Sequence, residues 1–296
     1  MRTVLLTGVT GFVGRACLEP LLRLGFTVHG VARRAGRFDA PFTKHEADLL
    51  DPTQVSALIR EVRPSYLLHL AWIATPGVYW TSAENTRWLE SSRHLLMEFQ
   101  KQGGTRAVVA GTCAEYDWSE GVCREGSTPL RSASIYGESK NALREALAAT
   151  GLNHAWARLF FPYGPHEPVG RLVPSVIRSL QDGLVPECSP GTHARDFIHV
   201  SDVGAALSLL LTANIQGAIN IGSGEAVPIR QIGERLLELI PGKIAWGARP
   251  QPKEPPLVVA DVTRLRRELG FQPRFDWRTG LADAAVWWQP RLARAA

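Results

Sequence analysis

The chain has 296 residues, of which 45% are hydrophobic and 21% are charged, and its formal net charge is +5. This is a globular composition, and it excludes a disordered or fibrous protein. The positive charges are spread along the chain, so no basic run predicts a nucleic-acid-binding arm. No apolar stretch approaches the ~20 residues that span a bilayer. We therefore expect a soluble cytoplasmic protein that binds neither nucleic acid nor a membrane.

The four cysteines, Cys17, Cys113, Cys123 and Cys188, show neither a metal-ligand spacing nor a disulfide framework. We expect reduced thiols and no bound metal. The apolar run at the N-terminus is short and ends in glycine, so it predicts a first strand and not a signal peptide.

A glycine-rich turn, Thr-Gly-Val-Thr-Gly-Phe-Val-Gly, occupies residues 7–14 between a short apolar run and an apolar-periodic segment. It predicts a strand, a turn and a helix, the context of a dinucleotide-binding fingerprint. Gly8 would permit the tight turn, Gly11 would let the backbone approach a pyrophosphate, and Gly14 would let helix and strand pack closely. The helix N-terminus would present N–H groups to the diphosphate. The residues expected to contact the dinucleotide here are Gly8, Thr10, Gly11, Phe12, Val13 and Gly14.

Strand-like apolar runs alternate with amphipathic segments through the first half of the chain. The expected strands are 4–6, 27–31, 66–70, 107–110 and 154–159. The expected helices are 13–24, 52–62, 88–100 and 135–149. Such alternation is typical of an α/β fold of the Rossmann type, a doubly wound parallel sheet covered on both faces.

The alternation of strands and helices becomes less regular after Phe161, because prolines and glycines interrupt the chain and later elements are shorter. We predict that residues 1–165 form a dinucleotide-binding domain, to which 194–215 return. Residues 166–296 would form mainly a smaller C-terminal α/β substrate domain. The proline-rich segment 250–256 is expected to be a loop.

The end of the second predicted strand bears on the choice of dinucleotide. An acidic residue there hydrogen-bonds the ribose 2′-OH in doubly wound folds, whereas arginine accommodates a 2′-phosphate. Here the strand ends in Ala32-Arg33-Arg34, and two cations can make charge-assisted contacts to a phosphate. Arg33 and Arg34 therefore favour NADP over NAD, although NAD is possible and the alternative is a pair of solvated arginines.

Further cofactor contacts are expected where a strand between 27–31 and 66–70 should end, just before Asp48, and at the end of the strand 66–70. Asp48 could accept a hydrogen bond from the adenine amino group, or it could cap the helix that starts near Pro52. The other candidates are Leu49, Leu70 and Ala71.

Tyr136 and Lys140 place a phenol and an ammonium one turn apart on one face of the predicted helix 135–149. A free tyrosine titrates near ~10, too high for efficient proton exchange at neutral pH. A lysine cation and the positive nicotinamide ring would lower the pKa of the phenol, and Lys140 could also hold a ribose hydroxyl. Thr112 follows the predicted strand 107–110, so its hydroxyl should lie at the carboxyl edge of the sheet, where ligands bind.

With these motifs the chain resembles the extended short-chain dehydrogenase/reductase family, in its branch of nucleotide-sugar epimerases, dehydratases and ketoreductases. The likeness covers almost the whole chain. It is carried by the glycine motif, His69-Leu70-Ala71, Thr112, Tyr136 with Lys140, Arg158, Tyr163-Gly164-Pro165, the segment 195–200 with Asp202, and the segment 220–224.

The resemblance implies roles for these residues. Tyr136 would be the general acid/base, Thr112 would bind the reacting oxygen, and Lys140 would tune Tyr136 and orient the ribose. Arg195 would contact the substrate diphosphate, with Arg249 as a second candidate. On physical grounds alone Arg195 could equally be a buried partner of Asp196 or Asp202. The resemblance also implies a homodimer that pairs through the helices 88–100 and 135–149.

The chain departs from the family at several positions. Family 4,6-dehydratases carry an Asp-Glu pair directly after the threonine, whereas Cys113 and Ala114 stand there in this chain and cannot act as carboxylates. Glu115 comes one place late, and on a strand a one-residue shift points a side chain to the opposite face. Dehydration is therefore disfavoured.

Other departures concern the substrate pocket. Phe161 stands where many relatives have an asparagine that contacts the sugar nucleotide, and Trp88 could replace another asparagine. The remaining aromatic residues that could stack on a sugar or base, or else fill the core or a dimer interface, are Tyr79, Trp80, Tyr116 and Trp118. Of these, Tyr116 joins Arg195, Arg249, Thr112 and Phe161 as an expected substrate contact.

These observations together predict an NADP-dependent oxidoreductase that acts at C4 of a nucleotide-activated sugar, as a 4-ketoreductase. The first alternative is a nucleotide-sugar 4-epimerase with tightly bound NAD(P). Two further alternatives are a reductase of a non-sugar carbonyl and a non-catalytic dinucleotide-binding protein.

Overall fold

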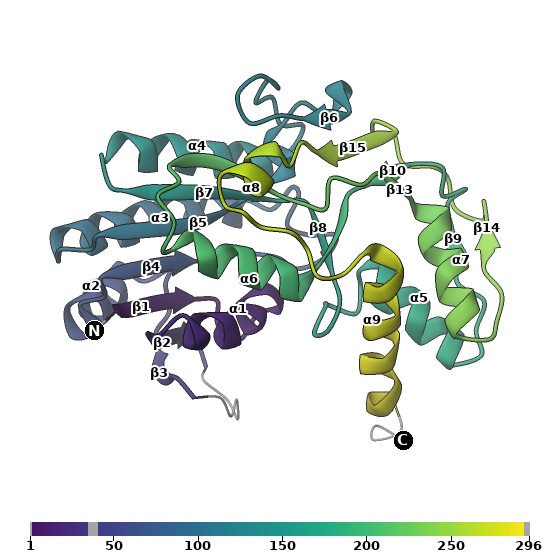
Figure 1. The fold of residues 1–296 in the computed structure, drawn as a ribbon, viewed down its shortest axis with the longest axis horizontal. Helices are drawn as coiled ribbons and strands as arrows, with labels where there is room; N and C mark the ends of the chain where they lie inside the picture. The colour runs from purple at the N-terminus through teal and green to yellow at the C-terminus, as the bar shows by residue number, and fades with distance from the viewer. Residues whose placement is uncertain (1, 35–40, 293–296) are drawn as a thin grey trace.

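The computed structural model describes residues 2–34 and 41–292. Within these ranges the centre of the molecule is a seven-stranded parallel sheet in the order β12-β7-β5-β4-β1-β2-β3 (Figure 1). The strands are β1 (Arg2–Thr7), β2 (Phe26–Ala32), β3 (Thr43–Glu46), β4 (Tyr66–His69), β5 (Arg106–Thr112), β7 (His154–Leu159) and β12 (Gly217–Ile221). The predicted α/β fold with a doubly wound parallel sheet is confirmed.

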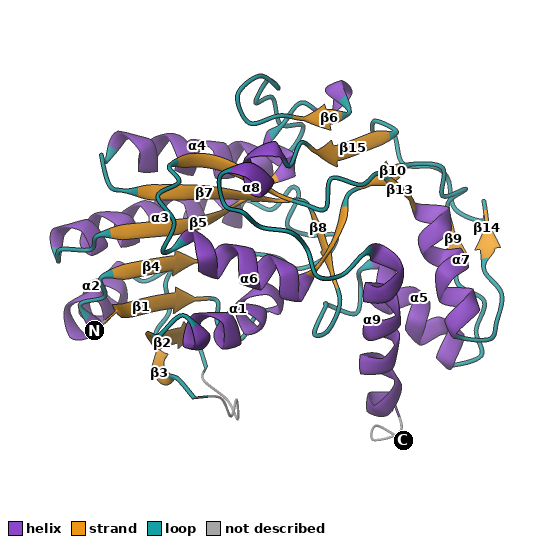
Figure 2. Cartoon of the chain, in the orientation of Figure 1, coloured by secondary structure: helices purple, strands orange, loops and turns teal. Residues whose placement is uncertain are grey.

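Helices cover both faces of this sheet (Figure 2). On one face α1 (Phe12–Arg23) packs against α6 (Val200–Leu210), and their apolar residues share a core with one side of the strands. The other face is covered by α2 (Pro52–Val62), α3 (Glu84–Lys101) and α4 (Ile135–Ala149). Because both faces are buried, the inner strands β1, β4, β5 and β7 are near-continuous apolar runs, which is why the sequence predicts them well. The edge strand β3 is an exception, since its residues are polar and mostly exposed.

The start of α2 corrects one expectation. Asp51 is the residue that caps this helix, since its carboxylate accepts hydrogen bonds from the backbone N–H groups of Thr53 and Gln54. The side chain of Asp48 instead accepts from the N–H of Leu50 at 3.0 Å. The alternative that Asp48 caps the helix is therefore wrong.

The remaining elements lie beyond the carboxyl ends of the central strands. The strand β8 (Phe161–Tyr163) pairs with β11 (Phe197–His199), and the helices α5 (Leu172–Gln181), α7 (Ile229–Leu239) and α9 (Trp277–Leu292) share a separate core. A four-stranded sheet has the order β13 (Val227–Pro228), β10 (Ala194–Arg195), β15 (Leu257–Ala260) and β6 (Val122–Cys123). The outermost pair is β9 (Glu187–Cys188) with β14 (Ala245–Trp246), and α8 (Thr263–Arg267) follows β15.

The chain returns to the central sheet over a longer stretch than the sequence predicts. After α6, β12 pairs in parallel with β7 at the edge of the sheet, so residues 217–221 belong there although the predicted return stops at 215. The apolar residues Ile219 and Ile221 of this strand are fully buried in the core beneath α6. The proposed division near residue 165 stays a prediction.

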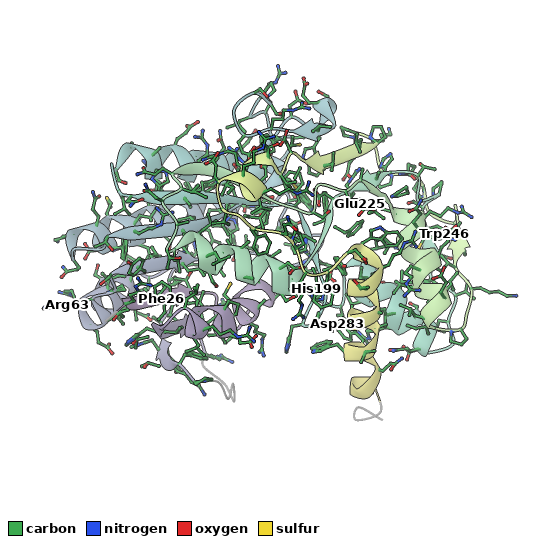
Figure 3. All side chains as sticks on the ribbon, viewed as in Figure 1. Phe26, Arg63, His199, Glu225, Trp246 and Asp283 are labelled. Atoms are coloured by element: carbon green, nitrogen blue, oxygen red, sulfur yellow. The ribbon has the colours of Figure 1, made fainter. Side chains whose placement is uncertain are left out.

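A contact between distant segments ties α9 to the start of α6. The imidazole of His199 caps α6, because its Nδ1 accepts from the N–H of Ser201. Its Nε2 lies 3.3 Å from the carboxylate of Asp283 on α9, and Figure 3 labels both residues. The helix α9 is thus linked to the start of α6, which covers one face of the central sheet.

The contact between α1 and α6 gives the first prediction. A Cβ atom at Gly204 would overlap the carbonyl group of Ala16, so Gly204→Ala should destabilise the protein by about 1–3 kcal/mol through overpacking. Chemical denaturation measures this loss. Gly126→Ala is the matched control, because open space surrounds Gly126, and its effect should stay within about 0.5 kcal/mol. Equal stability of the two variants would contradict this packing.

Candidate active site

A cleft of about 420 Å³ opens at the carboxyl ends of β1, β4 and β5. It lies where the strand order reverses direction on either side of β1, the place where open α/β sheets bind ligands. Segments far apart in the sequence line it. They are the glycine turn, residues 70–74, 79–80 and 110–113, Tyr136, Lys140, residues 159–162, 167–168 and 171–172, and Phe197.

The glycine turn forms one end of the cleft. Gly8 has φ +70°, and a Cβ there would come within 3.0 Å of the backbone nitrogen of Ala71. A Cβ at Gly14 would overlap the carbonyl oxygen of Gly8. Gly11 begins α1 with no side-chain cap and no acidic residue in the first turn, which leaves N–H groups of that turn available to a phosphate. A dinucleotide diphosphate therefore fits this turn.

All but one of the predicted residues of this motif line the cleft. The lining includes Gly8, Gly11, Phe12, Val13 and Gly14, whereas Thr10 is not part of it. The carbonyl of Thr10 instead accepts a hydrogen bond from Nε of Arg15 at 2.9 Å.

The floor beside the turn is held by a buried chain of hydrogen bonds. The hydroxyl oxygen of Thr7 accepts from the N–H groups of Leu70 and Ala71, at 3.0 and 3.1 Å. Its proton is then free to go to Nδ1 of His69 at 2.8 Å, which leaves Nε2–H to donate to Ser92. Burial, together with the charge of Lys140, lowers the pKa of His69 to about 3, so the imidazole stays neutral. Leu70 and Ala71 both line the cleft, as predicted.

The other predicted cofactor residues lie along the same edge of the sheet but outside the cleft lining. Arg33 and Arg34 directly follow β2 and are exposed. Asp48 and Leu49 follow β3, and Leu49 is buried. Because β2 is the neighbour of β1, this edge continues from the glycine turn.

The three predicted catalytic residues meet in the cleft. Thr112 ends β5, while Tyr136 and Lys140 lie in the first turns of α4, which Ser134 caps by accepting from Gly137 N–H at 3.2 Å. A Cβ at Gly137 would overlap the carbonyl oxygen of Ala114. The absence of that atom lets α4 approach the turn after β5 and brings Tyr136 close to Thr112.

Burial governs the charges in this group. The pKa of Tyr136 is raised above its ordinary value by burial and by Tyr79, while the Thr112 hydroxyl and Arg171 lower it. Burial lowers the pKa of Lys140 to about 7, against the opposing effect of Glu115. In the protein alone, desolvation therefore outweighs the groups that lower the pKa of the phenol. The lowering expected from Lys140 together with the nicotinamide ring stays a prediction.

Lys140 itself has two close partners. Its Nζ donates a hydrogen bond to the carbonyl oxygen of Ala110 at 2.9 Å. The same nitrogen lies 3.9 Å from the ring centroid of Trp72, a lining residue that the sequence analysis did not single out.

Aromatic rings surround the phenol. The rings of Tyr79 and Trp80 meet Tyr136 edge to face, with centroids 4.8 and 5.8 Å away. Both line the cleft together with Phe161. Trp118 packs against Trp80 at 6.2 Å. Tyr79, Trp80 and Phe161 are thus placed to contact a ligand.

Tyr116 lies elsewhere. It is buried outside the cleft lining, where its hydroxyl donates to Asn220 Oδ1 at 2.8 Å and accepts from Arg158 at 2.9 Å. In this position Tyr116 does not line the cleft, so the structure does not support the substrate contact expected of it.

The residues after Thr112 form a 3-10 turn, Cys113–Glu115, and not a continued strand. The predicted reason for Glu115 to face away is therefore wrong, although its carboxylate is indeed committed elsewhere. It accepts from the N–H of Thr112, from the indole of Trp156 and, at 2.6 Å, from Nε of Arg158, and it is fully buried. Cys113 lines the cleft, and burial raises the pKa of its thiol well above the ordinary value.

Arg195 has a partner that the sequence did not suggest. Its guanidinium is buried and contacts Glu254 at 3.0 Å. The two aspartates named in the alternative are satisfied by backbone N–H groups, Asp196 by Ser223, Gly224 and Ala260, and Asp202 by Arg274 and Phe275. The alternative that Arg195 is buried with an acidic partner is therefore met, but the partner is Glu254 and neither aspartate.

Neither predicted substrate arginine lines the cleft. Arg249 is exposed, and its Nε lies 3.9 Å from Glu187.

Two charged residues of the cleft were missed by the sequence analysis. Glu167 is 5% exposed and accepts a hydrogen bond from Gly164 N–H at 3.3 Å. Burial raises its pKa to about 8, against the opposing charge of Arg171. Arg171 stands at the N-terminus of α5. The sequence contained a clue to both residues, because they lie in the loop that follows Tyr163-Gly164-Pro165, at the carboxyl end of β8.

Comparison with known proteins identifies the family. The sequence profile described as the NAD dependent epimerase/dehydratase family matches residues 4–222. This chain belongs to that family. It is therefore an enzyme of a family that uses a nicotinamide dinucleotide, for which the glycine turn provides the fit described above.

Similar proteins extend over the full length of the chain. A UDP-glucose 4-epimerase of Azospirillum brasilense is 27% identical, with 99% of this chain and 93% of that protein aligned. The solved structure of MoeE5 in complex with UDP-glucose and NAD is 29% identical, with a TM-score of 0.85 and coverage of 98% and 99%. A UDP-glucose 4-epimerase of Thermotoga maritima shares the fold at 22% identity, with a TM-score of 0.87 and the same coverage.

The described residues contain no helix that combines the length and the apolar character needed to cross a membrane. Within residues 2–34 and 41–292, no group of three or more His, Cys, Asp or Glu side chains is arranged to hold a metal ion.

The burial of Lys140 gives the second prediction, that Lys140→Met raises the melting temperature most at acidic pH. The pKa of Lys140 is about 7 in the folded protein and ~10.4 in the unfolded chain. Below pH 7 both states carry the ammonium, so the full cost of burying it is present. As pH rises from 7 toward ~10.4 the folded lysine loses its proton first, and the cost falls. The gain should thus be a few degrees, roughly, near pH 6 and smaller at pH 9.

Thermal unfolding at the two pH values measures this difference. The matched control is Lys101→Met, because Lys101 is exposed and its ammonium lies 3.8 Å from Glu98. A gain for Lys140→Met that is equal at both pH values would contradict the charge-burial argument.

Proposed function

We propose that this enzyme acts at C4 of a nucleotide-activated sugar with a nicotinamide dinucleotide as the hydride carrier. The observation that supports this most is that Thr112, Tyr136 and Lys140 line the same cleft as the glycine turn. The relatives support the substrate class, because their names and bound ligands are those of nucleotide sugars. Residues 79–80 and Phe161 add the aromatic walls that a sugar ring or base can stack on.

The residues divide the work at the reacting oxygen. Tyr136 holds the proton at its phenol oxygen and exchanges it with the substrate oxygen, and the hydroxyl of Thr112 hydrogen-bonds the same oxygen. Lys140 supplies positive charge beside them and a donor for a ribose hydroxyl. The bound dinucleotide supplies or accepts the hydride. In reduction, one hydride to carbon and one proton from Tyr136 convert a ketone into an alcohol.

The reduction of a 4-keto sugar is our leading candidate reaction, with NADPH as the reductant. Arg33 and Arg34 support NADPH, because two cations at the end of β2 suit the 2′-phosphate of this cofactor. Dehydration is disfavoured, because Cys113 and Ala114 are no carboxylates and Glu115 is fixed in its contact with Arg158.

A nucleotide-sugar 4-epimerase is the second candidate. The similarity to UDP-glucose 4-epimerases and to an NAD complex favours it. The same three residues would serve, and the two candidates differ in whether the dinucleotide is consumed.

Incubation with a 4-keto nucleotide sugar and NADPH separates them. A ketoreductase removes the near-ultraviolet absorbance of the reduced cofactor in proportion to the alcohol formed. Retained absorbance, together with inversion at C4 of a matching nucleotide sugar, would identify the epimerase and reject our leading candidate.

Arg171 is better placed than Arg195 or Arg249 to meet the substrate phosphates. It lines the cleft at the N-terminus of α5, whereas the guanidinium of Arg195 is committed to Glu254 and Arg249 is exposed next to Glu187. We therefore propose Arg171 as the diphosphate contact.

We also propose that the protein is a homodimer paired through α3 and α4. Exposed apolar side chains on both helices support this, with Met97 57% and Ile135 42% exposed.

The third prediction tests the phenol. Tyr136→Phe should leave dinucleotide binding intact and lower turnover about 10²–10⁴-fold, because it removes the exchangeable proton while keeping the ring. Steady-state kinetics and fluorescence titration measure the two effects. Tyr66→Phe is the control, since Tyr66 begins β4 and so lies at the amino ends of the strands, away from the cleft. Unchanged turnover in Tyr136→Phe would remove Tyr136 from the mechanism.

The fourth prediction tests the cofactor choice. The double variant Arg33→Ala, Arg34→Ala should weaken NADPH binding about 100-fold and NADH binding hardly at all, because only the 2′-phosphate loses charge-assisted contacts. Calorimetric titration gives both affinities. Arg23→Ala, at the far end of α1, controls for the loss of surface charge. Equal losses for NADPH and NADH would reject a phosphate clamp.

A further inference from the structure

The ammonium of Lys140 has little water around it. The side chain is 3% exposed, and one hydrogen bond, to the carbonyl of Ala110 at 2.9 Å, accounts for one of its three protons. The face of the Trp72 indole lies 3.9 Å away, measured from Nζ to the ring centroid. A cation within about 6 Å of a ring centroid is attracted by the negative face of the ring, and more strongly where water is excluded.

Trp72 is held in one orientation by a residue of another element. Its indole N–H donates to Oδ1 of Asn85 at 2.8 Å, and Asn85 lies fully buried in the first turn of α3. The amide nitrogen of Asn85 donates in turn to the carbonyl oxygens of Tyr79 and Ser82, at 2.7 and 2.8 Å. Three hydrogen bonds thus fix the plane of the indole, whose edge meets α3 while its face meets Lys140.

The charged and titratable groups around Lys140 do not replace this contact. Glu115, on the turn after β5, favours the ammonium, but its carboxylate is committed to Arg158 at 2.6 Å. His69, on β4, stays neutral, since its pKa is lowered to about 3. Tyr136, one turn earlier on α4, has its pKa raised by burial and so carries no negative charge near neutral pH.

We propose that Trp72, locked by Asn85, is a positioning residue that keeps Lys140 protonated and directed into the cleft. This inference rests on the proposed role of Lys140 in the reaction. In this role Trp72, a residue of the cleft wall outside the motif of tyrosine and lysine, keeps the lysine of that motif positively charged.

The test is the pKa of Lys140, measured in the full chain without added dinucleotide. The chain has five lysines, so protein made with ¹³C-labelled lysine gives few Cε signals, and the one missing from Lys140→Met belongs to Lys140. Trp72→Leu should lower the pKa of Lys140 by about one unit, because the aromatic face is lost. Trp72→Phe, which keeps a smaller face, should lower it by less. The alkaline limb of the activity profile should move in the same order.

Trp88→Phe is the matched control. Trp88 neighbours Trp72, with ring centroids 6.2 Å apart, and lies on α3. Its replacement removes an indole without touching Lys140 and should leave the pKa unchanged.

Three outcomes would overturn the proposal. If Trp72→Leu and Trp72→Phe fold normally and the Lys140 pKa equals that of Trp88→Phe, Trp72 only fills space. If the pKa rises, Trp72 acts by excluding water and not by attracting the cation. If dinucleotide affinity falls while the pKa stays constant, Trp72 is a ligand contact. Because the pKa is read without turnover, these results are distinct from a failure of the proposed function, which Tyr136→Phe reports.

Discussion

Desolvation of the cleft is the constraint on which the chemistry of this protein depends. Withdrawal from water raises the pKa of the Tyr136 phenol and lowers that of the Lys140 ammonium, so both groups are biased toward their neutral forms. A neutral lysine beside a neutral phenol does not favour proton transfer. The contacts that matter are therefore those that restore charge, and the Ala110 carbonyl and the Trp72 face are the two closest to Lys140.

The fold supplies these contacts by bringing distant segments to one edge of the sheet. The reversal of strand order around β1 opens a crevice between the ends of β1 and β4. Glycines then set how closely the surrounding elements approach, at Gly14 between α1 and the turn and at Gly137 between α4 and the turn after β5. The cleft wall at Leu70 and Ala71 is held by hydrogen bonds from their N–H groups to the buried hydroxyl of Thr7. The result is a cleft with a phosphate-binding end and a proton-exchanging end.

The sequence predicts the fold well for a physical reason. Strands buried on both faces and helices buried on one have periodicities that are visible in a single sequence, and the ranges 52–62, 135–149 and 154–159 are those of α2, α4 and β7. The motif residues Tyr136, Lys140 and Thr112 are brought together because the motif encodes local geometry at the carboxyl edge of a sheet.

What the sequence does not give are the partners of individual side chains. Arg195 pairs with Glu254, 59 positions along the chain, because the loop before β15 folds over it. Glu115 is withdrawn from the cleft by Arg158 on β7, and β12 joins the sheet through pairing with that same strand. Trp72, Glu167 and Arg171 enter the cleft from loops without periodicity. Such pairings depend on tertiary contacts between distant segments, so a local sequence pattern cannot predict them.

For Tyr136 to exchange a proton near neutral pH, positive charge in the cleft, from Lys140 and from the oxidised nicotinamide ring, must offset the effect of burial on the pKa of its phenol. The direct measurement is an ultraviolet difference titration of that phenol with and without saturating NAD or NADP. The chain has five tyrosines, so subtraction of the Tyr136→Phe spectrum isolates one. We expect the phenol to titrate above its ordinary range in the free protein and its pKa to fall by about two units or more when the oxidised dinucleotide binds. An unchanged pKa in the bound protein would contradict the account.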